Sequence, residues 1–106
     1  MSGVRFRDPA GSVRKGNWHG DAVSFGGETY DLDAVEVLPP CEPEKIVCVG
    51  LNYADHAAER GKDVPDRPLL FLKPPNTVSG HGDTVTLPAG KDRIDHEAEI
   101  AVVMGQ

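Results

Sequence analysis

The sequence has few of the features that mark secreted, membrane-spanning or redox-active proteins. Only two of its 106 residues are cysteines, Cys41 and Cys48, they do not form a Cys-x-x-Cys motif, and Cys48 lies in the apolar run Ile46–Val49. We therefore expect both thiols to be reduced. No apolar run approaches the roughly 20 residues of a membrane-spanning helix, and residues 1–10 carry two arginines and an aspartate where a signal peptide would be apolar. The sequence predicts a cytoplasmic protein with no membrane partner.

Positive charge and nucleotide-binding motifs are also scarce. Eleven lysines and arginines stand against 17 aspartates and glutamates, which gives a formal charge of −6, and no basic stripe is interleaved with aromatic residues. This charge opposes binding to a phosphate backbone, so we expect no nucleic-acid partner. The sequence contains no Gly-x-Gly-x-x-Gly motif, no phosphate-binding loop and no nucleophile elbow. These absences argue against a dinucleotide-binding fold and against a serine hydrolase of the α/β type.

What the first part of the sequence does contain is a series of short β-type segments separated by turn residues. The segments lie around residues 4–6, 13–18, 22–25 and 29–32, and glycines stand between them, as in Gly26–Gly27. Three prolines at positions 39, 40 and 43 then interrupt any regular element. We predict a small antiparallel β unit over residues 1–43 and the start of a second unit at residue 44.

The second part of the sequence favours further strands and one short helix. Residues 45–50 read as a buried strand, and residues 52–60 as a helix with Asn52 as a capping candidate and Gly61 as its stop. Residues 67–75, 84–88 and 94–104 have the pattern of three more strands. The predicted fold class is therefore β-dominated α+β, in a chain whose length fits one domain.

Two glutamates interrupt the last of these predicted strands. Glu97 and Glu99 are separated by one residue, so in a strand both would project to the same face, and from Ile100 onward the segment is apolar on both faces. Two buried carboxylates repel each other and lose hydration, and a divalent cation that prefers oxygen ligands would offset both costs. A solvent-facing glutamate pair at the end of the strand explains the spacing equally well.

A histidine and a glutamate occupy one face of the predicted helix. His56 and Glu59 are three residues apart, and a carboxylate beside an imidazole can orient it as a general base. A surface His–Glu contact without function fits the same pattern. Lys73 could hold an anionic substrate or remain solvated. His96 should face away from the two glutamates, where we expect it to be packed or hydrogen-bonded.

Four motifs in order resemble the fumarylacetoacetate hydrolase family. They are Lys45–His56 with the sequence KIVCVGLNYADH, Leu70–Pro75 with LFLKPP, Gly82-Asp83 with Leu87-Pro88, and His96–Gly105 with HEAEIAVVMG. The resemblance covers about residues 45–106, and it implies that a small N-terminal β unit precedes the first part of the family's mixed β-roll. It is strongest to members described as acylpyruvate hydrolases, oxaloacetate decarboxylases and 2-hydroxyhepta-2,4-diene-1,7-dioate isomerases.

The resemblance also implies roles for individual residues. Glu97 and Glu99 would be two of three carboxylate ligands of a Mg²⁺ or Mn²⁺ ion, His56 and Glu59 the dyad that activates water, and Lys73 a lysine near the substrate. The third ligand of the family is an aspartate about thirty residues further on, followed by another substrate lysine, and neither lies within these 106 residues. We therefore expect an N-terminal part of a longer enzyme, inactive alone.

The implied function is that of a metal-dependent hydrolase, isomerase or decarboxylase. Its substrates would be short 2-oxo or 1,3-dicarbonyl acids from aromatic or central-carbon catabolism, and the full-length enzyme would be a homodimer, as is usual in the family. The alternative is a non-catalytic β module that serves folding or assembly with a partner chain, because sheet edges favour association.

Overall fold

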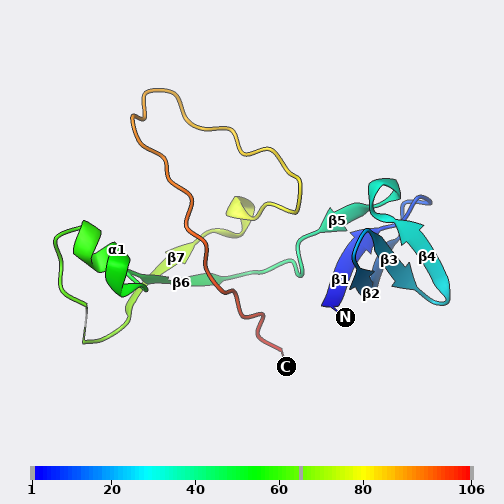
Figure 1. Cartoon of the computed structure of the whole chain (residues 1–106), viewed down its shortest axis with the longest axis horizontal. Helices are drawn as coiled ribbons and strands as arrows, with labels where there is room; N and C mark the ends of the chain where they lie inside the picture. Colours follow the sequence, from blue (N-terminus) through cyan, green and yellow to red (C-terminus); the bar gives the residue numbers. More distant parts are fainter. Residues whose placement is uncertain (1, 65, 106) are drawn as a thin grey trace. The chain divides into compact units, whose positions relative to one another are not determined.

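The computed structural model describes residues 2–64 and 66–105 and divides into two compact units. One unit comprises the residues up to Cys41 together with those from Ser79 onward, and the other comprises Glu42–Val78 (Figure 1). Strands are the main regular structure of the described residues, and helix is limited to one α-helix and two short 3₁₀ turns. The prediction of a β-dominated fold is confirmed.

The first unit contains a five-stranded antiparallel sheet in the order β4-β3-β2-β1-β5. Its strands are β1 Ser2–Arg7, β2 Val13–His19, β3 Ala22–Phe25, β4 Glu28–Asp31 and β5 Glu36–Leu38, with the 3₁₀ turn η1 Leu32–Ala34 before β5. The sequence predicted the first four strands and missed β5. Gly26 and Gly27 connect β3 to β4 with positive φ values of 60° and 83°, a two-residue turn that suits glycine because it lacks a Cβ.

The core of this sheet is small and centred on two fully buried side chains. Phe6 of β1 and Val23 of β3 have no exposed surface, and the ring of Tyr30 tilts against that of Phe6 at a centroid distance of 6.0 Å. Burial of one such side chain contributes roughly 1.5–3 kcal/mol to folding. The Arg14 guanidinium lies 4.9 Å from the centre of the Phe25 ring and extends this layer.

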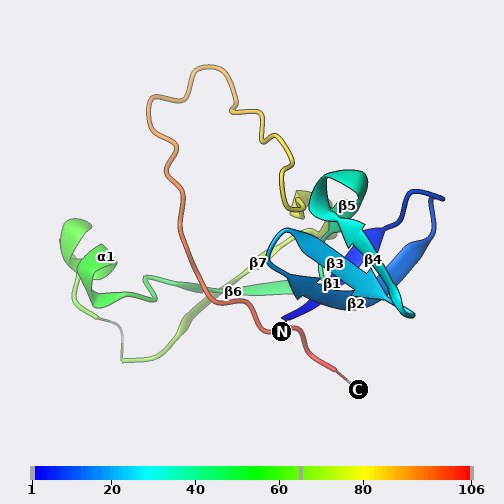
Figure 2. The same cartoon turned by 45° about the vertical axis from the view of Figure 1, so that its right-hand side comes forward.

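The second unit is a two-stranded antiparallel ribbon with one helix between its strands. Strand β6 Ile46–Gly50 leads into α1 Ala54–Glu59, and β7 Leu69–Lys73 returns along β6 before the 3₁₀ turn η2 Pro75–Thr77. Figures 1 and 2 both show α1 following β6 at one end of this ribbon. The helix begins after Tyr53 and has no side-chain cap, so the prediction of Asn52 as its N-cap is wrong.

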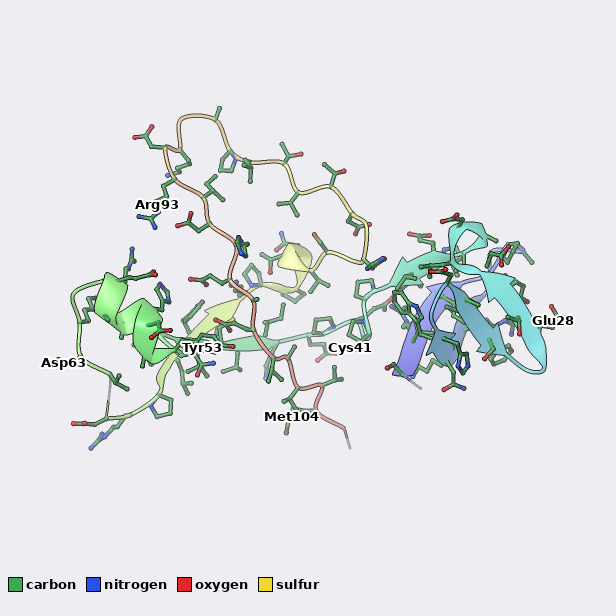
Figure 3. All side chains as sticks on the ribbon, in the orientation of Figure 1. Glu28, Cys41, Tyr53, Asp63, Arg93 and Met104 are labelled. Carbon is green, nitrogen blue, oxygen red and sulfur yellow. The ribbon has the colours of Figure 1, made fainter. Side chains whose placement is uncertain are left out.

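Two predicted strands are not formed. Residues 84–88 and 94–104 have no regular secondary structure, and Figures 1 and 2 draw this yellow-to-red part of the chain as coil. The predicted burial is wrong as well, because Ile100 is 90% exposed and Met104 is 85% exposed. Figure 3 shows the labelled Met104 on this coil segment. A strand is stable only when a neighbour takes up its backbone hydrogen bonds, and no strand of the described residues pairs with these segments.

Two further predictions can be compared with the structure. Cys41 and Cys48 are both free thiols, each partly buried. Within residues 2–64 and 66–105, no helix is long and apolar enough to cross a membrane.

Candidate functional site

The connection between β6 and α1 positions the candidate dyad. Gly50 ends β6 opposite Leu69 of β7, and a Cβ at Gly50 would lie 3.0 Å from Cδ2 of Leu69. Leu51 follows with a φ of 50°, a left-handed conformation that costs a leucine about 1–2 kcal/mol. This sharp turn directs the chain from the ribbon into α1. The sequence contains no signal for it, because leucine is not a residue that favours this conformation.

The helix itself is short and is closed by backbone hydrogen bonds at its C-terminal end. The Lys62 N–H donates to the Ala57 carbonyl at 2.9 Å, and the Gly61 N–H donates to the Ala58 carbonyl at 3.0 Å. Together with the positive φ of 66° at Gly61, these two bonds form a Schellman motif. The sequence correctly predicted Gly61 as the stop signal, and this motif ends the helix directly after Glu59.

His56 and Glu59 lie on this helix, as predicted. They are three positions apart, so they share one helical face. His56 is partly buried and precedes the fully buried Ala57, whereas Glu59 is exposed. An imidazole at the boundary between core and solvent can exchange protons with a bound molecule and with water. This environment agrees with either interpretation of the pair, a surface contact or an acid–base dyad.

Lys73 belongs to the other end of the ribbon. It pairs with Ile46, whereas α1 leaves the ribbon after Gly50, four residues along β6. At 3.3 Å per residue the two ends of this strand are about 13 Å apart. Lys73 is exposed, and its Nζ atom lies 6.0 Å from the centre of the Phe71 ring on the same face of β7. The strand register therefore separates Lys73 from the point where α1 begins.

Glu97 and Glu99 lie in the coil segment of the first unit. Both are exposed, so the expected cost of burying two carboxylates does not arise in this structure. His96 is exposed too, and the expectation that it would be packed is wrong. Among the described residues, no three histidine, cysteine, aspartate or glutamate side chains come together as a metal site. The two carboxylates have the oxygen chemistry that Mg²⁺ and Mn²⁺ prefer, but they supply only two ligand groups.

The structure thus places the predicted residues in two sets. His56, Glu59 and Lys73 belong to the unit of residues 42–78, and Glu97 and Glu99 belong to the other unit. The sequence missed one local arrangement in that other unit, an edge-to-face contact between Trp18 and His81, whose ring centroids are 5.3 Å apart. The sequence contains no signal for it, because the contact joins two residues far apart in the chain.

Comparison with known proteins identifies the class to which this chain belongs. Residues 45–106 match the family model described as "Fumarylacetoacetate (FAA) hydrolase C-terminal". The match covers more than half of the chain and includes all five predicted site residues. The chain belongs to the fumarylacetoacetate hydrolase family.

Two relatives with printed names share sequence with this chain. The chain is 50% identical over 62 residues to "Oxaloacetate tautomerase FAHD1, mitochondrial" of Arabidopsis thaliana, an alignment that covers 58% of this chain and 28% of that protein. It is 43% identical over 87 residues to "Oxaloacetate tautomerase YisK" of Bacillus subtilis, which covers 77% of this chain and 29% of that protein.

A solved structure resembles most of this chain. It is that of an uncharacterised protein from Mycobacterium abscessus, with 33% sequence identity and a TM-score of 0.63, and the match covers 85% of this chain and 40% of the other. The chain thus spans between 28% and 40% of the length of these three proteins.

Proposed function

We propose that this chain contributes catalytic and metal-binding residues to an enzyme that interconverts the keto and enol forms of a short 2-oxo dicarboxylic acid, of which oxaloacetate is the model. The observation that carries the proposal is the family match over residues 45–106, which contains every residue with a predicted role. The names of the two tautomerase relatives favour tautomerisation over the hydrolysis and decarboxylation that the sequence left open.

Glu97 and Glu99 are the proposed ligands of a Mg²⁺ or Mn²⁺ ion. Their carboxylate oxygens are hard donors, and their spacing of two residues allows both to face one ion when the backbone is extended. When bound, such an ion polarises the 2-oxo carbonyl as a Lewis acid and thereby acidifies the neighbouring C–H bond. Because two ligand groups leave coordination positions to water or substrate, the affinity for the ion depends on further ligands.

His56 is the proposed proton carrier. Tautomerisation moves one proton from the carbon beside the carbonyl to the carbonyl oxygen, with no net gain or loss of atoms. A neutral imidazole accepts the proton at one ring nitrogen and returns it from there, and the carboxylate of Glu59 would orient the ring and stabilise its cationic form. The partial burial of His56 leaves its ring at the boundary between core and solvent.

Lys73 is proposed to attract the anionic substrate to this unit. Its exposed ammonium group lies at the ribbon end about 13 Å from the end of β6 that leads into α1, so it does not hold the same four-carbon acid at the same time as His56. A point charge of this kind binds a carboxylate without demanding a fixed geometry.

A chimera tests these assignments together. The matching segment of the Bacillus subtilis tautomerase is replaced by this chain, and loss of enol absorbance from oxaloacetate is followed with Mg²⁺ present. His56→Ala should lower kcat by about 10²- to 10⁴-fold, because it removes general acid–base catalysis. Glu97→Gln should raise the Mg²⁺ concentration needed for half activity by about tenfold or more, because it removes a charged ligand.

The matched control is Lys62→Gln, at an exposed position just after α1. It should leave kcat and the Mg²⁺ concentration needed for half activity unchanged. A chimera that stays fully active after His56→Ala would contradict the proton-carrier role. An unchanged Mg²⁺ requirement after both Glu97→Gln and Glu99→Gln would contradict the ligand role.

Exposed apolar surface favours a second candidate, a non-catalytic module for folding or assembly. Leu70 and Leu72 of β7 are 60% and 70% exposed, which is unusual for a surface that does not bind another protein segment. The chimera separates the two functions. An assembly module would support folding of the chimera but not tautomerisation, and its variants at His56 and Glu97 would not differ from each other.

A further inference from the structure

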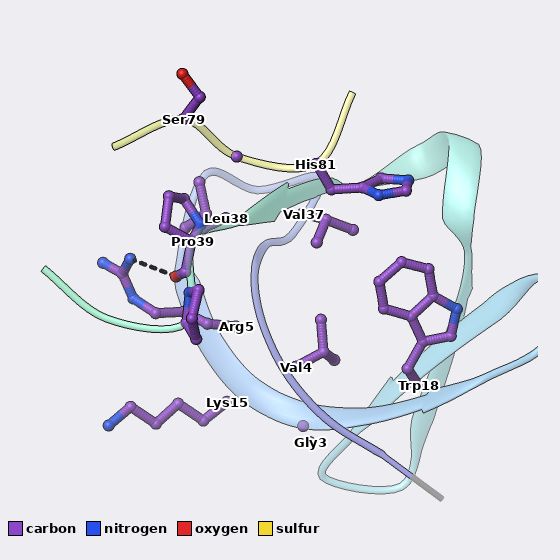
Figure 4. A pocket seen from close by; sticks show the side chains of 13 residues that line it. Gly3, Val4, Arg5, Lys15, Trp18, Val37, Leu38, Pro39, Ser79 and His81 are labelled. Atoms are coloured by element: carbon purple, nitrogen blue, oxygen red, sulfur yellow. Dashed lines mark hydrogen bonds between the residues drawn. The ribbon is translucent and has the colours of Figure 1, made fainter. Parts of the chain in front are cut away.

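A groove of about 500 Å³ in the first unit is held together by hydrogen bonds of its own. Figure 4 shows it between β1, the end of β5 and the turn of residues 79–81. Arg5 donates from Nη1 to the Pro39 carbonyl at 3.2 Å, the dashed line in Figure 4. The indole N–H of Trp18 donates to the Gly20 carbonyl at 2.7 Å. These bonds stabilise the groove walls and do not indicate a ligand.

The outer edge of β7, in the second unit, presents a more specific surface. In the part of the chain that the structure describes, β7 pairs with β6 alone, so its other edge offers backbone N–H and C=O groups. All five residues of β7 are exposed, whereas four of the five residues of β6 are partly buried. Pro68 and Pro74 flank the strand and lack an N–H, which disfavours pairing beyond residues 69–73. The edge thus suits one extended segment of about five residues.

Residues 99–103 have the composition that this edge requires. Three of the five are β-branched, none is proline, and the sequence is Glu-Ile-Ala-Val-Val. All five are exposed and have no regular secondary structure, and no strand of the described residues pairs with them. A segment of this kind forms a strand when an open edge takes up its backbone hydrogen bonds.

One antiparallel register matches the edge and the segment position by position. In it Lys73 would lie opposite Glu99, and the four apolar residues of β7 would lie opposite residues 100–103, which are apolar as well. A parallel alignment would place Lys73 opposite Val103 and the glutamate opposite Leu69, so that each charge meets an apolar side chain. The charged pair therefore selects the antiparallel direction.

The same register would extend both faces of the ribbon. Leu70 and Leu72 share a face with two valines of β6, because directly opposite residues of neighbouring strands point to the same side. Ile100 and Val102 would continue this apolar face onto a third strand. On the other face, the small side chain of Ala101 would lie beside the aromatic ring of β7. A third strand would stabilise a ribbon that is marginal with two.

We propose that the outer edge of β7 binds residues 99–103 of a second copy of this chain. The edge and the segment belong to the same sequence, and among the described residues of one chain they are not paired with each other. Each copy has one edge and one segment, so two copies exchange segments about a two-fold axis and form two identical contacts.

Charge reversal tests the proposed pair. Sedimentation velocity of the 106-residue chain is measured with EDTA present, so that no divalent cation engages Glu99. We expect the wild type to form dimers with a Kd on the order of 100 μM. Lys73→Glu and Glu99→Lys should each raise this Kd by about tenfold or more, because like charges then meet in both contacts. Lys91→Glu, at another exposed lysine, makes the same change of charge and should leave the Kd unchanged.

Mixing the two charge-reversal variants distinguishes a second copy from pairing within one chain. In a dimer of Lys73→Glu with Glu99→Lys, each contact again joins one acidic and one basic side chain. An equal mixture should therefore restore dimers to within about threefold of the wild-type Kd. Pairing within one chain would give no rescue on mixing, and only the double variant would recover it.

A pair of prolines tests the backbone contact. Two adjacent residues of a strand direct their N–H groups to opposite edges, so Ala101→Pro with Val102→Pro removes a donor to β7 whichever way the segment lies. This variant should raise the Kd by about tenfold or more, and Val85→Pro with Thr86→Pro, in exposed coil, should not. Circular dichroism verifies that the variants are folded. Nuclear Overhauser effects between Phe71 of a labelled copy and Ala101 of an unlabelled copy verify the register.

Three results would each overturn the proposal. The first is a wild-type chain that stays monomeric at concentrations about tenfold above the expected Kd. The second is a pair of charge-reversal variants that dimerise like the wild type, or that recover only when both changes are in one chain. The third is a dimer that survives the two prolines, which would mean that apolar faces pack together without an exchange of strands.

Discussion

Asp8 shows how a single buried charge organises the turn between β1 and β2. It is 7% exposed, its Oδ1 accepts a hydrogen bond from the Ser12 N–H at 2.9 Å, and its Oδ2 accepts one from Nε of Arg14 at 3.1 Å. The Ser12 hydrogen bond is the main cause that holds the pKa of Asp8 below its ordinary value of 3.8, with Arg14 adding to it and burial opposing it. The ionised form is therefore favoured by folding.

Substitution of Asp8 should have a pH-dependent effect on stability. A carboxyl group whose pKa is lower in the folded state stabilises the fold above its unfolded pKa, and this contribution is lost as the pH falls through the lower, folded value. We expect Asp8→Asn to lower the thermal midpoint at pH 7 and to differ less from wild type as the pH drops below 3.8. Thermal denaturation followed by Trp18 fluorescence measures this difference. Asp92→Asn, at an exposed position, is the control. A gap between wild type and Asp8→Asn that stays constant with pH would contradict the assignment.

At the scale of elements, two glycines of the same sheet differ sharply in the space around them. A Cβ at Gly16 of β2 would overlap the Ser24 carbonyl oxygen of β3 and lie 3.2 Å from Cε1 of Phe6. A Cβ at Gly3 of β1 would meet nothing within 4 Å. Glycine at position 16 is therefore required by the close approach of β2 and β3, whereas position 3 tolerates a side chain.

The matched pair Gly16→Ala and Gly3→Ala tests this difference. We expect Gly16→Ala to reduce the free energy of unfolding by about 2 kcal/mol, because the strands must separate to admit the methyl group. Gly3→Ala should change it by less than about 0.5 kcal/mol. Urea denaturation followed by Trp18 fluorescence gives both values. Equal effects at the two positions would mean that β2 and β3 do not approach as closely as described.

Short sequence patterns predicted the elements that depend on neighbouring residues in the chain. The glycine pair at 26 and 27 predicted the β3–β4 hairpin, and Gly61 predicted the end of α1. Strand β5 was missed because its pairing with Arg5–Arg7 depends on residues about thirty positions away. The prolines that directly follow it are also atypical of a strand. The segment 94–104 has a strand pattern, but a pattern states only what a segment would form beside a suitable neighbour.

Some features of the candidate site could also be predicted from local patterns, and others could not. The helical spacing of His56 and Glu59 could be predicted because three residues make nearly one turn. The φ of 50° at Leu51, which precedes their helix, could not be predicted, because leucine rarely adopts this conformation and no local pattern indicates it. The two carboxylates at 97 and 99 could be recognised as an oxygen donor pair, but their exposure depends on contacts that a single segment does not specify.

For the whole molecule, the dominant property is apolar surface left open to water. Besides Leu70 and Leu72, side chains of the last described residues contribute to it, such as Val102 at 77% and Met104 at 85% exposure. Surfaces of this kind associate in solution, while the charge of −6 only partly opposes contact between copies.

We therefore expect the 106-residue chain to self-associate as its concentration rises. The double variant Leu70→Glu and Leu72→Glu adds charge to one face of β7 and should weaken this association by about tenfold or more, because like charges then meet in the contact. Sedimentation velocity over a concentration series measures the effect. Val13→Glu, at an exposed position of the other unit, is the control. A wild-type chain that stays monomeric at high concentration would contradict the expectation.

The single indole of the chain has a consequence for how cooperatively this molecule unfolds. Trp18 belongs to the unit built on the five-stranded sheet, and α1, the one α-helix of the described residues, belongs to the unit of residues 42–78. The fluorescence of Trp18 therefore reports on the sheet unit, and helical ellipticity reports on the unit of residues 42–78. Both signals can be recorded from one sample without an added label. Coincident transitions would mean that the two units melt as one cooperative body, and separated transitions would give each unit its own midpoint.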